Sequence, residues 1–214
     1  MKRIILFFSL IFTSLFGFSQ DSKISITVKE HIKARVDNNI NVGVAVGYVD
    51  GKDVELFNYG KTNIENGTDV NENTVFEIGS ISKTFTTTLL ALKVNSGEMS
   101  LDDPASKYLP KSVKMPTRNG KEITLKHLAT HTSALPRLPD NLKPANPNNP
   151  YADYTIEQLY AFLNSCKLVY NIGEKSEYSN LGMGLLGHIL ELQSGKTYEE
   201  LIIKHIANPL QMND

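Results

Sequence analysis

Cysteine is almost absent from this chain of 214 residues, which contains only Cys166. A single thiol excludes an internal disulfide, and it also excludes a structural zinc site built from cysteines. The chain also lacks an excess of charge of one sign, because its 22 basic residues nearly balance its 23 acidic residues. Without a basic stripe we expect no nucleic-acid partner. The hydrophobic content of 41% is that of a globular chain able to bury a core.

A hydrophobic run long enough to span a membrane is also missing. The apolar run over residues 4–18 is shorter than the roughly 20 residues that a spanning helix needs. Two basic residues precede it, and Gly17 and Ser19 occupy the small-residue positions of a cleavage site. We therefore predict a signal peptide at 1–19, with an uncleaved anchor as the alternative. Residues 20–214 would then be secreted across the inner membrane into the periplasm, with no stable membrane span.

The β-structure that the sequence predicts is confined to one hairpin. Two β-branched runs, 42–49 and 54–60, flank Asp50 and Gly51, which is a strong hairpin signal. Two strands rarely form a stable sheet alone. The apolar faces of this hairpin therefore need a partner that the sequence does not obviously contain, which is a physical indication of truncation.

Helices are expected over most of the remaining chain. The segment that begins near Ser80 is apolar or small nearly all round, as in a buried helix. Between the helices, residues 137–153 are rich in proline and asparagine, and they predict an irregular excursion. No internal repeat is present. The other expected helices span residues 21–37, 125–130, 154–163 (capped by Thr155), 181–192 and 198–207.

Ser80 and Lys83 form a Ser-x-x-Lys motif at the start of the apolar helix. Serine is a poor nucleophile unless a base lies beside it, and a spacing of three places both side chains on one helix face. A desolvated lysine can lose its proton near neutral pH. The positive end of the helix dipole also suits an oxyanion forming on an attacked carbonyl.

Tyr178 and Asn180 form a second short motif, Tyr-x-Asn, just before another apolar helix. Tyr178 could shuttle a proton between Ser80, the leaving group and water. Asn180 could donate and accept hydrogen bonds at once, and so align Lys83 with a substrate amide. Both motifs are short enough to arise by chance. The structural alternatives are Ser80 as a helix N-cap beside a solvated lysine, and Asn180 as an N-cap at a turn.

Three further patterns are read as structural. His127 and His131 have the spacing of a zinc-binding helix, but the Glu of the metalloprotease pattern is missing, so capping or packing is expected and no metal. Residues 194–197 are like the end of a phosphate-binding loop without its upstream glycine, which favours a helix stop. The chain contains no Gly-x-Ser-x-Gly, which argues against an α/β-hydrolase.

Residues 76–83, 125–136 and 178–212 together resemble the serine β-lactamase and penicillin-binding protein superfamily, in its class C, esterase and DD-peptidase branch. The second motif begins with Tyr178 rather than following the class A pattern Ser-Asp-Asn. The resemblance covers nearly all of residues 40–214. It implies an α+β fold in which a helical domain lies beside an antiparallel sheet. Residues 20–214 would be the N-terminal portion of that domain, with its C-terminal strands missing from this chain.

The resemblance also implies the chemistry. Ser80 would be acylated by a β-lactam, an ester or an amide carbonyl, and water would release the acyl group. Lys83 and Tyr178 would share the base role, and Asn180 would help to hold the substrate. No cofactor and no metal are implied. The partner would be a small β-lactam, a D-Ala-D-Ala peptide or an ester, and the sequence leaves the choice among them, and the oligomeric state, open.

The sequence departs from the family pattern in three places. No Lys-Thr-Gly or His-x-Gly element is found; in the family that strand supplies an oxyanion donor, whose loss costs on the order of 3–4 kcal/mol. This truncated chain is therefore expected to be inactive by itself. Second, Arg137 and Leu138 stand where class C enzymes often carry Gln, which argues against a strict cephalosporinase. Third, the proline-rich residues 137–153 lie between the two motifs and would line the site. The alternatives are a non-catalytic cell-envelope binding domain of the same fold and an inactive fragment.

Overall fold

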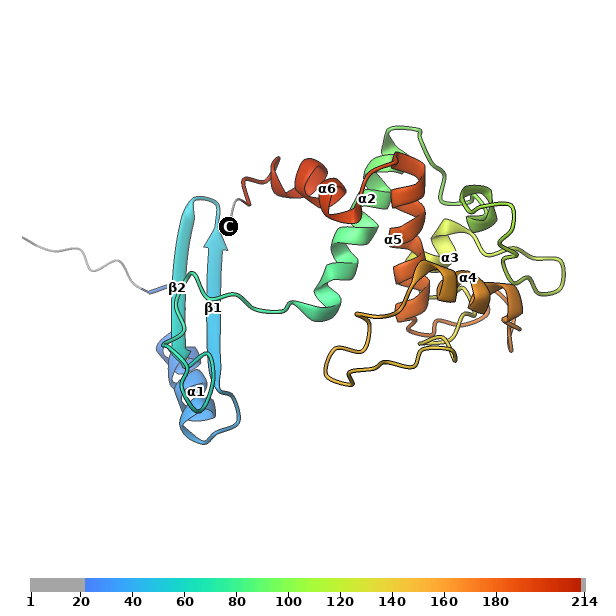
Figure 1. The fold of residues 1–214 in the computed structure, drawn as a ribbon. Helices are drawn as coiled ribbons and strands as arrows, with labels where there is room; N and C mark the ends of the chain where they lie inside the picture. Colours follow the sequence, from blue (N-terminus) through green and yellow to red (C-terminus); the bar gives the residue numbers. More distant parts are fainter. Residues whose placement is uncertain (1–21, 213–214) are drawn as a thin grey trace, which may run out of the picture. The chain divides into compact units, whose positions relative to one another are not determined.

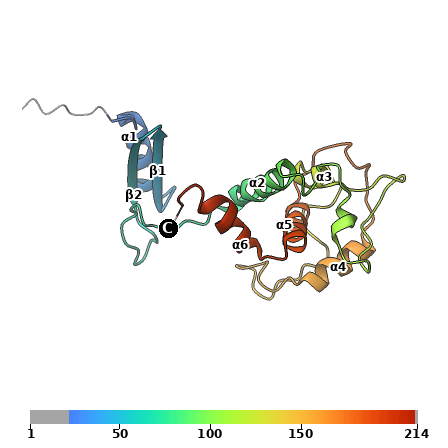
Figure 2. The same ribbon diagram turned by 90° about the horizontal axis from the view of Figure 1, so that it is seen from above.

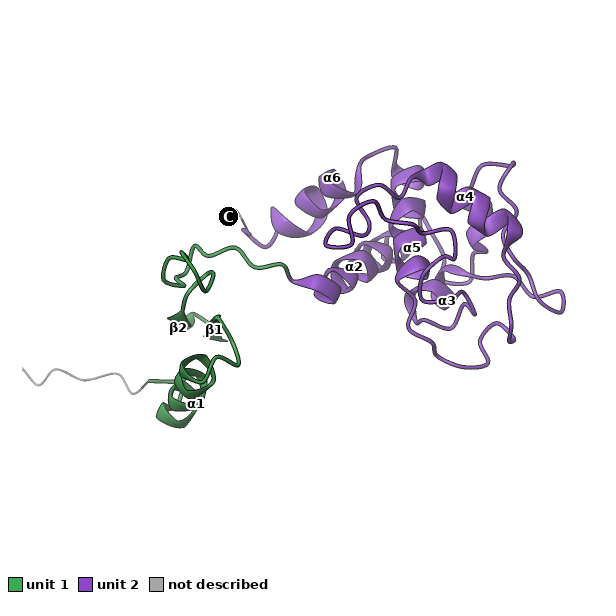
Figure 3. Ribbon diagram, turned by 60° about the horizontal axis from the view of Figure 1, so that its bottom comes forward, with its two compact units in different colours: residues 1–77 green, residues 78–214 purple. Residues whose placement is uncertain are grey.

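The computed structural model describes residues 22–212, so the predicted signal peptide at 1–19 lies outside the described residues. The chain divides into two compact units, one up to Glu77 and the other from Ile78 onward (Figure 3). No helix within residues 22–212 combines the length and the apolar character needed to cross a membrane.

The first unit consists of one helix and one hairpin. Helix α1 (Ile26–Asp37) is followed by the antiparallel strands β1 (Gly43–Asp50) and β2 (Asp53–Gly60). The register runs from Gly43 opposite Gly60 to Asp50 opposite Asp53, so the turn falls at the Asp-Gly signal, and the predicted hairpin is confirmed. Within the described residues these two strands form the whole sheet.

The two faces of the hairpin differ in their cover. The α1 face carries Phe57 and Tyr59, and Lys29 and Lys33 of α1 lie 5.7 and 5.8 Å from the centroids of these two rings. On the opposite face the apolar side chains are exposed, at 69% for Val49, 64% for Val54 and 53% for Leu56. The unpartnered apolar face that the sequence predicts is therefore present in the described part of this unit.

The second unit is helical and is organised around its longest helix. Helix α5 (Asn180–Ser194) packs against three other helices (Figures 1 and 2). These are α2 (Ser82–Asn95), α3 (Leu125–Ala129) and α6 (Tyr198–Ile202). Helix α4 (Ile156–Ser165) begins at the predicted cap Thr155, whose hydroxyl accepts the Gln158 N–H in a capping box.

Helix α5 forms the centre of the core because its sequence is apolar on almost every side. Leu185, Leu186 and Ile189 are fully buried. Each such side chain contributes about 1.5–3 kcal/mol relative to an exposed one. Gly195 ends the helix with a φ of 67°, a left-handed conformation that glycine adopts without strain. The glycine in residues 194–197 is therefore a helix stop, as expected.

The prediction that α2 is buried all round is wrong. Thr86, Leu89 and Leu90 are buried, whereas Leu92 is 42% exposed. Among the described residues the helix packs through one side only, towards α5 and α6. The last predicted helix also differs, because α6 continues as a π-helical turn over Ile203–Ala207.

The proline-rich segment is irregular, as predicted, but local hydrogen bonds hold it. The Asp153 carboxylate accepts the Ala145 N–H at 2.9 Å. The Tyr154 hydroxyl donates to the Asn141 side chain at 2.9 Å. These bonds shape a loop that returns the chain to the start of α4.

Candidate active site

Ser80 lies in a short 3₁₀ turn, Gly79–Ile81, that leads directly into α2. Gly79 enters this turn with a φ of 52°, in the left-handed region. The Ser80 side chain makes no capping hydrogen bond, so the N-cap alternative does not describe it. Instead its hydroxyl oxygen accepts a hydrogen bond from the Lys83 ammonium, with Nζ and Oγ 3.2 Å apart. The three-residue spacing therefore places both groups on one face, as expected.

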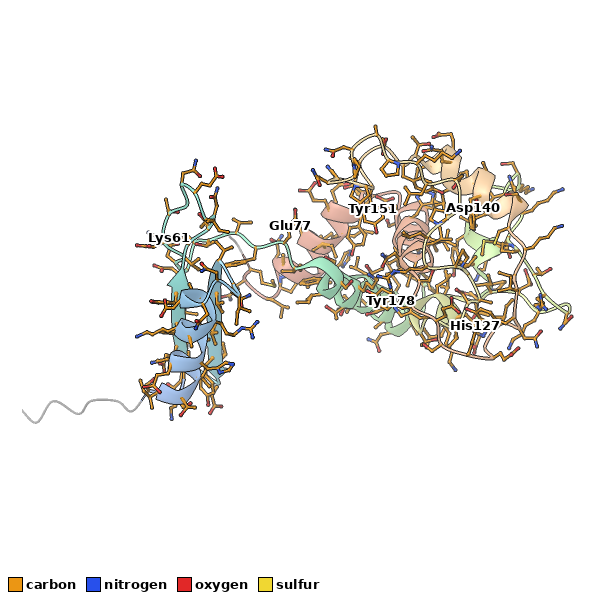
Figure 4. All side chains as sticks on the ribbon, turned by 90° about the horizontal axis from the view of Figure 1, so that it is seen from below. Lys61, Glu77, His127, Asp140, Tyr151 and Tyr178 are labelled. Carbon is orange, nitrogen blue, oxygen red and sulfur yellow. The ribbon has the colours of Figure 1, made fainter. Side chains whose placement is uncertain are left out.

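Tyr178, labelled in Figure 4, lies in the segment that precedes α5. It reaches the same serine from 98 residues along the chain. Its hydroxyl donates to Ser80 Oγ at 2.5 Å. The Lys83 ammonium lies 4.7 Å from the centroid of the Tyr178 ring. The two sequence motifs thus meet at one oxygen atom, which is contacted by a lysine and a phenol.

The charges around Tyr178 favour its ionised form. The Lys83 ammonium beside the phenol, the hydrogen bond with Ser80 and the charge of Arg137 together lower the pKa of Tyr178. The Arg137 guanidinium carbon lies 5.1 Å from the centroid of the tyrosine ring. A phenol in this setting can release a proton at a lower pH than an ordinary tyrosine.

Asn180 is the first residue of α5, but it does not cap the helix. The cap is Ser179, whose hydroxyl accepts the Gly182 N–H at 2.8 Å, so the N-cap alternative for Asn180 is wrong. The Asn180 side chain donates from Nδ2 to the Tyr151 hydroxyl at 3.2 Å. Its Oδ1 atom is buried and has no hydrogen-bond partner among the described residues.

The two histidines make capping and packing contacts of the kind that the sequence predicts. His127 closes a capping box with Thr124 at the start of α3. His131 accepts the Ser179 N–H at Nδ1 over 3.2 Å, and its ring centroid lies 4.6 Å from that of Tyr178. Burial, helped by the Lys83 charge, lowers the pKa of His131. Residues 22–212 contain no group of three or more His, Cys, Asp and Glu side chains able to hold a metal ion.

A cavity of about 710 Å³ opens beside the serine. One wall is formed by Ser80, Lys83 and Asn180, and the proline-rich loop contributes Leu138, Leu142 and Tyr151. The expectation that residues 137–153 line the site is therefore confirmed for this cavity. Tyr151 escaped the sequence interpretation because it lies in an irregular loop, where no periodicity or motif marks a residue.

The sequence and the fold are both similar to those of known proteins. A family model described as Beta-lactamase matches residues 28–214. Escherichia coli AmpH, a D-alanyl-D-alanine-carboxypeptidase/endopeptidase, is 37% identical over 80% of this chain and 44% of its own length. A beta-lactamase of Yersinia enterocolitica is 31% identical over 96% of this chain and 52% of its own length. The chain thus spans about half the length of these relatives.

Solved structures show the same fold. A class C beta-lactamase superposes with a TM-score of 0.75 at 31% identity, over 92% of this chain and 51% of that one. A beta-lactamase/D-alanine carboxypeptidase from Yersinia pestis gives a TM-score of 0.74 at 29% identity, over 87% of this chain and 54% of that one. The β-lactamase/transpeptidase-like fold class predicted from sequence is confirmed.

Proposed function

This chain belongs to the beta-lactamase family, and from that premise we propose that the protein is a serine hydrolase that forms an acyl-enzyme on β-lactams or related amides and esters. The observation that carries the proposal is the convergence on Ser80. Its Oγ atom lies 2.5 Å from the Tyr178 hydroxyl and 3.2 Å from the Lys83 ammonium. Once Tyr178 has lost its proton, its phenolate beside the Lys83 ammonium is the adjacent proton acceptor that an activated nucleophile requires.

The first step would be acyl transfer to Ser80. As its oxygen attacks the carbonyl carbon, its proton passes to the ionised Tyr178, which Lys83 stabilises. The carbonyl oxygen becomes an oxyanion at the N-terminal end of α2, where the helix dipole favours negative charge. The carbon–nitrogen or carbon–oxygen bond then breaks, and the leaving group receives the proton from Tyr178.

The second step would be hydrolysis. Tyr178, again without its proton, accepts one from a water molecule that attacks the ester carbonyl. The tetrahedral intermediate collapses, the acid product leaves, and Ser80 regains its proton. Asn180 would hold a substrate amide through its side-chain amide group, because it lines the same cavity as Ser80.

An enzyme is favoured over a non-catalytic binding domain. A binding domain gains nothing from a lysine and a tyrosine that share one serine oxygen. The relatives are named as beta-lactamases and as a carboxypeptidase/endopeptidase, which supports β-lactams and D-Ala-D-Ala peptides as the substrate classes. A polypeptide of only these 214 residues would acylate poorly, since its sequence contains no Lys-Thr-Gly strand to complete the oxyanion hole.

The proposed place of action is the periplasm, with residues 1–19 removed as a signal peptide. The basic start and the apolar run of residues 4–18 support this location. Pulse labelling of cells that carry the native gene would test it. A processed form in the periplasmic fraction is expected, whereas an unprocessed cytoplasmic product would contradict it.

The experiment that tests the activity is intact mass spectrometry of the protein expressed from its native gene, with and without benzylpenicillin. A gain of one penicillin mass is expected for the wild type and none for Ser80→Ala. Ser82→Ala is the matched control, because Ser82 is the neighbouring serine in the first turn of α2 and should leave labelling intact. Labelling of Ser80→Ala would contradict the assignment of the nucleophile.

A further inference from the structure

One hydrogen bond joins the site to the proline-rich loop. Asn180 Nδ2 donates to the hydroxyl oxygen of Tyr151 at 3.2 Å, and both residues line the cavity beside Ser80. Figure 4 labels Tyr151, in the loop over residues 137–153, and Tyr178, in the segment that precedes α5. Asn180 therefore already uses one N–H donor to bond Tyr151, in a cavity that a ligand could enter.

Tyr151 is held by its backbone rather than by its hydroxyl. The Tyr151 carbonyl accepts the Tyr154 N–H at 3.3 Å, and the loop is closed by the bond between Ala145 and Asp153. The side chain is 55% exposed, and among the described residues its hydroxyl bonds only Asn180. The ring can therefore turn away without disturbing the loop, because one neutral hydrogen bond to a half-exposed group contributes little.

We propose that Tyr151 is a specificity-determining residue of this site, whose hydroxyl occupies one of the two N–H donors of the Asn180 amide until a substrate carbonyl on the acyl side displaces it. The inference rests on the proposed function, because it requires a substrate that acylates Ser80. It concerns substrates whose acyl group carries an amide of its own, as acylated amino acids and acylamino β-lactams do.

The exchange selects among substrates by hydrogen-bond acceptor strength. An amide carbonyl is a strong acceptor, and it replaces the phenolic oxygen on Asn180 Nδ2. A substrate without an acyl-side amide leaves the bond between Tyr151 and Asn180 in place and gains nothing from Asn180. Removing the Tyr151 hydroxyl should therefore help the first class of substrate and leave the second unchanged.

The test compares wild type and Tyr151→Phe in the full-length protein, using two penicillins. Benzylpenicillin carries an acylamino group, whereas 6-aminopenicillanic acid has a free amine at that position. The expected result is a rise of roughly two- to tenfold in the second-order acylation rate for benzylpenicillin, the range that one net neutral hydrogen bond spans. The rate for 6-aminopenicillanic acid should stay the same.

Two further variants separate this role from a loop effect. Tyr154→Phe removes a hydroxyl on the same loop that bonds Asn141 rather than Asn180, so the ratio of the two acylation rates should not change. In an Asn180→Ala background, Tyr151→Phe should have no effect on that ratio, because no amide donor remains to be occupied.

The outcomes are distinguishable. An unchanged or lower benzylpenicillin rate in Tyr151→Phe, with wild type still acylated, would overturn the inference and leave the proposed function intact. The same holds if Tyr154→Phe reproduces the effect. A wild-type protein that neither penicillin acylates would overturn the proposed function and this inference with it.

Discussion

Ser80 is exposed at the surface of its unit, and the reactivity that we propose for it would come from its two neighbours. The Lys83 ammonium, from the Ser-x-x-Lys motif, and the Tyr178 phenol, from the Tyr-x-Asn motif, both contact Ser80 Oγ. Arg137 adds a second positive charge near the phenol, at 5.1 Å from the ring centroid. Because Arg137 lies over the Tyr178 ring and makes no hydrogen bond with Ser80, its charge can be changed without removing a reacting group.

Arg137→Gln should move the pH profile of acylation. The Arg137 charge lowers the pKa of Tyr178, so its removal raises that pKa. If the phenolate is the base, the acid limb of the acylation rate shifts to higher pH. The measurement is the pH dependence of benzylpenicillin acylation, and Arg137→Lys, which keeps the charge, is the control. A profile that does not move in Arg137→Gln would rule out this electrostatic role.

Lys83→Gln should have the larger effect, because Lys83 is the first cause of the lowered pKa of Tyr178 and also bonds Ser80. We expect a loss of acylation of at least about a hundredfold, the usual contribution of a positioned acid–base group. Stopped-flow acylation at saturating penicillin would measure it. Lys93→Gln, at the other end of α2, is the control, and a near-wild-type rate in Lys83→Gln would contradict the proposed base pair.

For individual residues, the sequence predicted those contacts that follow from local spacing along a helix. Ser80 and Lys83 are three residues apart, so helical geometry alone brings them together. The meeting with Tyr178 rested on the family resemblance, because no local rule joins residues 98 positions apart. Tyr151 was missed, since its contact with Asn180 depends on how an irregular loop folds back onto α5.

The start of α5 fixes the position of the neighbouring loop at the site. Ser179 is 1% exposed, and its hydroxyl both accepts the Gly182 N–H and donates to the Pro136 carbonyl at 2.7 Å. One side chain therefore caps the helix and fixes the loop that carries Arg137. The backbone N–H of Asn180 also donates to the Arg137 carbonyl, at 3.0 Å.

Ser179→Ala should lower the free energy of unfolding by about 1–3 kcal/mol, because it removes an N-cap and also the hydrogen bond to the Pro136 carbonyl. Urea denaturation followed by circular dichroism would measure the change. Ser194→Ala, at the other end of α5, loses two local bonds, to the Glu191 carbonyl and from the Lys196 N–H, and should cost much less because Ser194 does not cap the start of the helix. Equal losses in the two variants would contradict the capping role.

The sequence could place elements more reliably than it could predict their burial. Only two residues of α2 are charged, which favoured a buried helix, yet Leu92 is 42% exposed. Burial depends on which neighbours a helix meets, and periodicity reports only its own residues. The same reason explains why Ser179, rather than Asn180, proved to be the cap: both residues are good caps, and only the folded turn selects between them.

The two units of the molecule are stabilised by different means. The helical unit has an apolar core centred on α5, whereas the first unit depends on a polar clasp between its hairpin and the start of α1. Glu55 of β2 accepts hydrogen bonds from Ser22 at 2.5 Å and from the Lys29 ammonium at 2.9 Å. These bonds lower the pKa of Glu55 from 4.5 to about 2, the Ser22 bond being the largest cause.

Acid should therefore loosen the first unit. A carboxyl group whose folded pKa lies below its unfolded value stabilises at pH above the unfolded value, and this contribution is lost as the pH falls from 4.5 towards about 2. The protection factors of the β1 and β2 amides, which allow for slower chemical exchange at low pH, should fall over that range. Glu55→Gln should show fast exchange already at pH 6, whereas Glu30→Gln, an exposed site on α1, should behave as wild type. Slow exchange in Glu55→Gln would contradict the clasp.

The bare face of the hairpin also determines how a polypeptide of these 214 residues behaves at high concentration. Val49, Val54 and Leu56 are exposed, and in the described residues β1 and β2 pair only with each other, so each strand presents an outer row of unpaired backbone groups. Such an edge is a template for another copy of the same strand. Self-association of the polypeptide would then proceed through this hairpin rather than through the helices. A charged residue in place of Val54 should be the most direct means of keeping the polypeptide monomeric.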